Sequence, residues 1–160
     1  MIFTETVSLW FEESLDKNAL APFVRALWDG DADTARETLT RILYGTISYH
    51  DGAENYYHGF MTGLLRGAGL PLSSNREQGL GRADIVVEDG PRRRALILEL
   101  KRAREYAHLD ARAEEGLRQI AERRYAATLS PQIRQVTMYG IAFWKKECAV
   151  KVSAGARTPA

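Results

Sequence analysis

Two carboxylates and one lysine stand beside neighbouring apolar runs of this 160-residue chain. Asp84 directly precedes the run Ile-Val-Val at 85–87, and Glu99 directly follows the run Leu-Ile-Leu at 96–98. Short β-branched and aliphatic runs are typical of buried strands. A charge at the end of such a strand is costly to bury unless an opposite charge, a metal ion or hydrogen bonds compensate it. The pattern therefore indicates a candidate site for chemistry.

The turn between the two runs predicts how they face each other. Asp-Gly-Pro at 89–91 is typical of a turn, and a four-residue loop at 90–93 places Asp84 opposite Glu99 in an antiparallel hairpin. Directly opposed residues project from the same face, with Cβ atoms about 4.5–5.5 Å apart. A slip of one residue would send one carboxylate to the other face. Two carboxylates this close repel each other, and a divalent cation is the usual remedy.

Lys101 stands two residues after Glu99 and so shares its face of the strand. An ammonium group there could hold, or help to deprotonate, a water molecule beside a metal ion. The alternative is a salt bridge from Lys101 to Glu99 or a neighbouring acid, which is the more common reason for an isolated Glu-x-Lys. Oxygen ligands favour Mg²⁺ or Mn²⁺ over zinc, and a single cysteine, Cys148, excludes a Cys-based zinc site.

The spacing of apolar residues predicts an all-helical front and a mixed α/β back, in one domain at 1–153 with a flexible tail at 154–160. Asp33 is expected to cap the third helix. Helices are predicted over residues 3–15, 18–28, 34–47 and 54–68. The back is predicted to hold strands at 71–77, 82–88 and 94–101, a helix at 109–129, and strands at 135–144 and 148–153. This order describes an α/β fold with a mixed sheet of about five strands.

Glu54 opens the fourth predicted helix. Helical spacing places it on one face with Tyr57, His58 and Met61, as expected for a helix leaning over a site. The alternative is an acid in the first turn, stabilised by the helix dipole. His58 itself has no metal-ligand spacing to another histidine, so we expect it to be a structural or surface residue.

The motifs GRAD at 81–84 and ALILELK at 95–101 resemble the PD-(D/E)XK nuclease superfamily. Residues 49–58 and 119–126 more narrowly resemble the branch found C-terminal to an AAA-ATPase-like domain in bacterial proteins. The resemblance covers about residues 3–152. It implies a restriction-endonuclease-like core of helix, three-strand meander, helix and two strands at 49–153, preceded by a helical extension at 1–48.

The resemblance assigns roles to three strand residues. Asp84 matches the metal-binding Asp, Glu99 the second acidic ligand and Lys101 the catalytic lysine. The backbone carbonyl of Leu100 would be a further ligand to Mg²⁺ or Mn²⁺. Ala83 stands where the superfamily pattern has proline, a change that removes no reactive group.

Two helical residues also match the superfamily pattern. Glu54 matches the acid on the first core helix, which completes the metal site directly or through water. Gln119 matches a polar position on the crossover helix that faces the site, and its alternative is a solvent-facing glutamine. The implied reaction is metal-dependent hydrolysis of phosphodiester bonds in DNA, with RNA left open.

The alternative function is a catalytically weak or inactive nuclease-fold module that binds nucleic acid or protein. The resemblance implies two possible associations with an AAA-ATPase-like domain: as a separate partner protein, or as a missing N-terminal domain. A homodimer is a further possible partner arrangement. The chain has no G-x-x-x-x-G-K-[ST] loop, so it is not itself expected to be an ATPase.

The formal net charge of +1 hides an asymmetry along the chain. Residues 1–55 carry four basic and ten acidic side chains, whereas residues 56–160 carry eighteen basic and eleven acidic ones. A basic region of this kind can attract a polyanion, and its alternative is a solvated surface. Five arginines are candidates for weak contacts to nucleic acid, although the first could instead pair with an acid: Arg82, Arg92, Arg93, Arg94 and Arg102.

The sequence has no apolar run of the roughly 20 residues that a membrane-spanning helix needs. Its N-terminal segment lacks the basic start of a secretory signal. A cytoplasmic location, without membrane partners, is therefore the simplest expectation.

Overall fold

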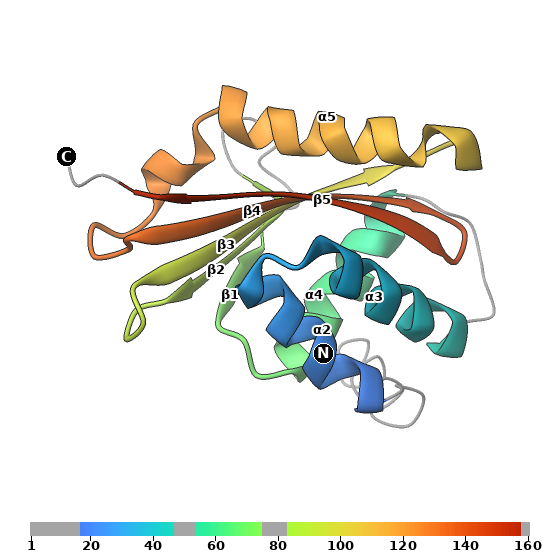
Figure 1. Ribbon diagram of the computed structural model, residues 1–160, viewed down its shortest axis with the longest axis horizontal. Coiled ribbons are helices and arrows are strands. Elements are labelled where there is room, and N and C mark those ends of the chain that lie inside the picture. Colours follow the sequence, from blue (N-terminus) through green and yellow to red (C-terminus); the bar gives the residue numbers. More distant parts are fainter. Residues whose placement is uncertain (1–16, 47–53, 75–82, 158–160) are drawn as a thin grey trace.

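The computed structural model describes residues 17–46, 54–74 and 83–157. Within these ranges a five-stranded sheet, with its strands in the order β1-β2-β3-β4-β5, has helices on both faces (Figure 1). The strands are β1 (Leu72–Ser74), β2 (Ile85–Asp89), β3 (Arg94–Arg102), β4 (Gln135–Trp144) and β5 (Glu147–Ala156). The helices are α2 (Lys17–Asp29), α3 (Ala32–Thr46), α4 (Glu54–Gly67) and α5 (Leu109–Glu122), with 3₁₀ turns η1 (Tyr106–His108) and η2 (Tyr125–Thr128).

The sheet is mixed, as the sequence predicts. Strands β1, β2 and β3 form an antiparallel meander, helix α5 crosses over the sheet, and β4 then pairs parallel to β3. Strand β5 returns antiparallel to β4. The expected mixed α/β fold is confirmed in the described residues, and the helix predicted over residues 3–15 lies outside them.

The hairpin register is also confirmed. Ile85 pairs with Leu98 and Asp89 pairs with Arg94, so that residues 90–93 form the four-residue connection. Continuing this register by one residue places Asp84 opposite Glu99. The turn chemistry was sufficient to predict the pairing because loop length fixes which residues face each other in a hairpin.

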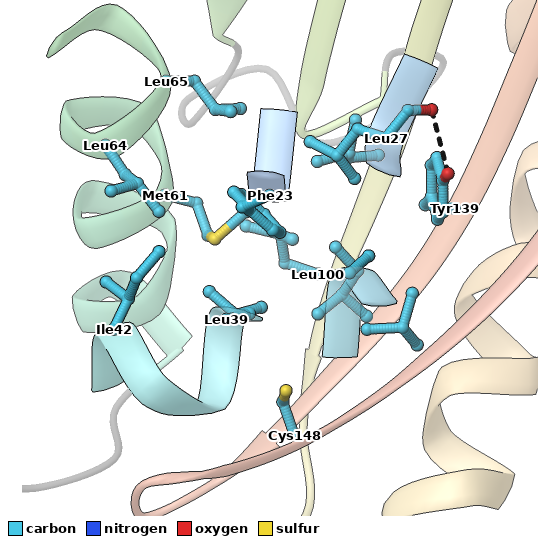
Figure 2. Packing of buried hydrophobic residues seen from close by; sticks show 14 of the residues in the cluster. Phe23, Leu27, Leu39, Ile42, Met61, Leu64, Leu65, Leu100, Tyr139 and Cys148 are labelled. Carbon is cyan, nitrogen blue, oxygen red and sulfur yellow. Dashed lines mark hydrogen bonds between the residues drawn. The ribbon is translucent and has the colours of Figure 1, made fainter. Parts of the chain in front are cut away.

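One face of the sheet packs on α2, α3 and α4. Alternation along β3 sends Leu96, Leu98 and Leu100 into this core, where they are at most 8% exposed. Figure 2 shows apolar side chains from the three helices meeting in the same cluster. The Tyr139 hydroxyl, buried in it, donates a hydrogen bond of 2.9 Å to the Leu27 carbonyl oxygen, so this polar group is satisfied.

The other face of the sheet packs on α5 at very short range. A Cβ atom added to Gly140 of β4 would lie 1.9 Å from the Ala113 carbonyl oxygen of α5. Gly116 of α5 lies over the same spot, since its own added Cβ would be 3.4 Å from the Gly140 Cα atom. Two glycines therefore let the helix backbone rest directly on the sheet.

The start of α3 and the end of the crossover helix differ most from the sequence prediction. Asp31, not Asp33, caps α3, because its Oδ1 accepts the Thr34 backbone N–H at 3.1 Å. The crossover helix ends at Glu122 instead of residue 129. Arg124 then adopts a left-handed backbone with φ of 53°, which stops the helix before the η2 turn.

The last strand is longer than predicted. Strand β5 continues to Ala156 because its small residues pair with the start of β4, for example Ala156 with Gln135. The Arg157 guanidinium then donates a 2.6 Å hydrogen bond to the Ser130 carbonyl oxygen. Residues 154–157, which the sequence predicts to be a flexible tail, are thus paired and bonded to the body of the protein.

None of the described helices is long and apolar enough to cross a membrane.

The close approach of two glycines gives a first prediction. Gly140→Ala should lower the free energy of unfolding by about 3 kcal/mol, because the new methyl group meets backbone atoms that cannot move aside. Gly155→Ala is the matched control, since a Cβ on this β5 glycine meets nothing within 4 Å. Urea unfolding monitored by circular dichroism measures both variants. Equal stability of the two would contradict the close packing of α5.

Candidate active site

Asp84 and Glu99 lie side by side at the end of the β2–β3 hairpin. Asp84 Oδ2 accepts the Leu100 backbone N–H at 2.8 Å, a bond that fixes its side chain across the strand end. The two carboxyl groups are close enough for a hydrogen bond between their side chains to raise the pKa of Glu99. The predicted convergence of the two acids is therefore present in the structure.

Glu99 is an acid in a buried position. It is 3% exposed. Burial is the largest cause that raises its pKa, to about 8, followed by the hydrogen bond and the charge of Asp84, while the Lys101 charge acts in the opposite direction. Among the described residues, Glu99 Oε2 has no hydrogen-bond partner. A cation or donor at this oxygen would relieve the cost of burying the charged group.

Lys101 is held by the crossover helix. Its Nζ donates a 2.6 Å hydrogen bond to Gln119 Oε1, and Gln119 Nε2 donates in turn to the Tyr125 hydroxyl at 3.4 Å. The alternative of a solvent-facing Gln119 is therefore wrong. The hydrogen bond of Lys101 goes to a neutral amide, and the charge of Lys101 acts to lower the pKa of nearby Glu99.

Helix α4 borders the site from the opposite face of the sheet. His58 Nε2 lies 3.2 Å from the Asp84 carbonyl oxygen, and the His58 side chain is 7% exposed. Glu54 begins this helix, but its side chain lies outside the described residues, so its predicted role is not tested. From the sequence, His58 is expected to be a structural or surface residue, with a place lining the site as the less favoured alternative. The helix face that it shares with Glu54 was the signal for its position against Asp84.

The described residues contain no cluster of three or more His, Cys, Asp or Glu arranged for a metal ion. Two acids, Asp84 and Glu99, do converge. A strand residue directs its N–H and C=O to the same side, so the Leu100 carbonyl leaves the strand on the side where its N–H meets Asp84. Two carboxylates and one carbonyl thus lie at one strand end, all of them hard oxygen groups.

The hairpin arginines lie far from this site. Arg94 begins β3 five residues before Glu99, which corresponds to about 17 Å along an extended strand. Its Nε bonds Asp89 Oδ2 at 3.0 Å, and its guanidinium lies 4.0 Å from the centre of the Trp28 ring. Arg92 lies 3.6 Å from the same Asp89 oxygen.

The other candidate arginines have different positions. Arg93 is exposed in the hairpin turn with φ of 54°. Arg102 is exposed and directly follows Lys101 at the end of β3, so its backbone lies beside the site. Alternation directs its side chain toward the α4 face, where its charge acts to lower the pKa of Tyr57. Arg82 lies outside the described residues. Of the predicted nucleic-acid contacts in the described part of the chain, only Arg102 is next to the converging acids.

Comparison with known proteins identifies the family. A model of the PD-(D/E)XK nuclease superfamily matches residues 52–153. The chain belongs to this superfamily. A search of curated proteins finds no match. The matched range extends from just before α4 into β5, so it includes the two acids, the lysine and the helix that holds it. The mixed α/β fold, with α5 packed on the sheet, is consistent with a nuclease-like core.

The shifted pKa of Glu99 predicts how stability depends on pH. An unfolded glutamate loses its proton near pH 4.3, whereas folded Glu99 retains its proton up to about pH 8. Between these values the folded state binds the extra proton. The contribution of Glu99 to stability is therefore fully present below about pH 4.3 and is lost as the pH rises to about 8, by up to about 1.4 kcal/mol per pH unit.

Glu99→Gln isolates this effect in protein kept free of metal with a chelator. Relative to the parent, the variant should become steadily more stable as the pH rises from 5 to 8, because the amide never has to ionise. Glu114→Gln, at an exposed position on α5, should follow the parent at every pH. Urea unfolding across this pH range makes the comparison. A constant difference between Glu99→Gln and the parent would show that Glu99 ionises normally.

Proposed function

We propose that this chain is a nuclease that hydrolyses phosphodiester bonds in DNA with Mg²⁺ or Mn²⁺. One observation carries the proposal: Glu99 is buried beside Asp84, and its Oε2 lacks a partner among the described residues. Such an arrangement is unfavourable for a purely structural sheet. It suits a site in which a bound cation keeps both acids ionised.

The residues present fit a hard divalent ion. Asp84 and Glu99 would supply carboxylate oxygens and Leu100 its backbone carbonyl, and Glu54 stands at the start of the helix that borders Asp84. These are the ligand types that Mg²⁺ and Mn²⁺ prefer. When bound, the ion polarises the phosphate and lowers the pKa of a coordinated water.

Lys101 would act on the water and on the developing charge. Its ammonium group stands on the same strand face as Glu99 and is held by the 2.6 Å bond to Gln119. A fixed ammonium group can orient the attacking water and offset negative charge on the phosphate in the transition state. Gln119 positions Lys101, because its second hydrogen bond, to buried Tyr125, fixes the amide.

The order of elements supports a restriction-endonuclease-like core. Helix α4 and strands β1–β3 are followed by α5 and the β4–β5 pair, with α2 and α3 as a helical extension on the same face of the sheet as α4. We assign the chain to the branch found beside AAA-ATPase-like domains on the motifs at 49–58 and 119–126. An ATPase of that kind is accordingly the proposed partner or neighbouring domain.

Metal binding can be tested without any activity. Millimolar Mg²⁺ or Mn²⁺ should raise the melting temperature of the parent protein, with a gain of about 2.7 kcal/mol at a metal concentration one hundred times Kd. Asp84→Asn should abolish the gain, since an amide can still accept the Leu100 N–H but carries no charge. Asp110→Asn, at an exposed position on α5, should retain the gain. A melting temperature that metal does not change would favour the binding-module alternative.

Cleavage is tested with plasmid, linear duplex and single-stranded DNA in Mg²⁺ or Mn²⁺. Lys101→Ala should reduce the rate by about 10²- to 10⁴-fold, the usual contribution of a residue that handles the proton of the nucleophile. Lys151→Ala is the matched control, because this lysine makes only a 3.6 Å ion pair with exposed Asp110. Equal product from Lys101→Ala and the parent would reveal a contaminating nuclease and remove the support for catalysis.

A further inference from the structure

A basic hollow lies beside the converging acids on the α5 side of the sheet. Its volume is about 550 Å³. Residues from the end of β3, from η1 and from α5 line it: Arg102, Arg104, His108, Ala111, Arg112, Glu115 and Arg118. Four arginines, one histidine and one acid are thus among its lining residues, and Arg102 presents its backbone carbonyl to Arg112 there. Guanidinium groups gathered in one concave place repel each other, and an anion bound among them would relieve that repulsion.

The single acid of the hollow does not neutralise it. Glu115 is paired with Arg112, and this bond is the largest cause that holds the pKa of Glu115 below its ordinary value. Arg112 Nε also donates a 3.0 Å hydrogen bond to the Arg102 carbonyl oxygen. The second bond ties α5 to the end of β3. Together the two bonds give the Arg112 guanidinium a fixed orientation, which lowers the entropy cost of binding a ligand there.

The hollow lies near the proposed catalytic site. Arg102 directly follows Lys101, and Glu115 stands one helical turn before Gln119, which holds Lys101. The charge of Lys101 also contributes to the lowered pKa of Glu115, so the two side chains are near each other. The hollow is therefore close enough to the two acids for a strand cleaved there to reach it.

We propose that the hollow binds a phosphate group of the nucleic-acid strand beside the bond that is cleaved. Arginine forks match phosphate oxygens, with two parallel N–H···O bonds in the best geometry. This inference rests on the proposed function. It adds that the protein binds a second phosphate group of the nucleic acid, beside the one that is cleaved. Two sources present the same chemistry: the terminal phosphate monoester of a strand end, and an internal phosphodiester of a continuing strand.

An exposed aromatic residue lies on the same short turn as His108 of the hollow and is a second candidate contact for a nucleotide. Tyr106 is 61% exposed and belongs to η1, the same short turn that contributes His108 to the hollow. Its ring packs edge-to-face against Trp144, with the ring centroids 5.7 Å apart. This contact holds the ring in place while most of its surface stays exposed to solvent. Aromatic rings next to basic grooves stack on the bases of single strands.

The test uses binding in a cleavage-blocked Lys101→Ala background with Mg²⁺ present. The double variant Arg104→Ala/Arg118→Ala removes two exposed arginines of the hollow, and Arg25→Ala/Arg66→Ala removes two exposed arginines from α2 and α4 on the opposite face. Fluorescence anisotropy reports affinity for short single strands with a 5′-phosphate, with a 3′-phosphate or with hydroxyl groups at both ends. A small single-stranded circle supplies internal phosphates only.

The hollow variant should bind at least about tenfold more weakly than its background. Its affinity should also depend less on salt, with a slope reduced by about one for each phosphate that the variant no longer binds. The opposite-face control should bind like the background. A preference for one phosphorylated end that disappears in the hollow variant identifies the terminal monoester. Equal weakening for all strands and the circle identifies an internal diester.

Unchanged affinity and salt slope in the hollow variant would overturn the inference, even if the parent protein cleaves DNA. Conversely, phosphate-dependent binding that the hollow variant lacks would support the inference even if the parent proves unable to cleave. The failure of the hollow as a phosphate site and the failure of the nuclease proposal thus give different results.

Discussion

The ionisable pair formed by Asp84 and Glu99 is the constraint on which the site depends. The hairpin register places the two acids opposite each other, and the surrounding sheet removes Glu99 from water. Apolar residues of similar size would stabilise a sheet at least as well. The pKa of Glu99, raised to about 8, shows how unfavourable the charged form is there without a cation. A charged glutamate in such a position lowers the stability of the fold, and the proposed cation would offset that cost.

The close packing of α5 on the sheet joins this pair to the rest of the site. Gly140 and Gly116 allow the helix backbone to rest on β4 and β3, and this approach brings Gln119 to within 2.6 Å of Lys101. The same helix carries Arg112 and Arg118 to the end of β3, where the basic hollow forms. One packing interaction therefore positions both the lysine of the proposed reaction and the surface proposed to hold the substrate.

Arginines of similar appearance in the sequence have different environments in the fold. The hairpin residue Arg94 forms an ion pair with Asp89 and lies over the Trp28 ring. Its contacts therefore stabilise the end of the sheet that is far from the two acids. At the other end of the same strand, Arg102 lines the hollow together with Arg104 and Arg118. Net charge alone could not separate these groups, because both lie in the basic part of the chain.

The sequence by itself determined the strands, their order and the pairing of the two acids, because these follow from apolar runs, turn residues and loop length, which act locally. It also indicated Lys101, which shares a strand face with Glu99. Only the tertiary structure decided where α5 ends and that Gln119 bonds Lys101. It also decided that His58 lies against Asp84. The same holds for the basic hollow, which residues from β3, η1 and α5 form together. These features depend on how closely elements that are distant in sequence pack against each other. The distance between α5 and the sheet is set by Gly116 and Gly140, and the sequence does not show that these two glycines meet.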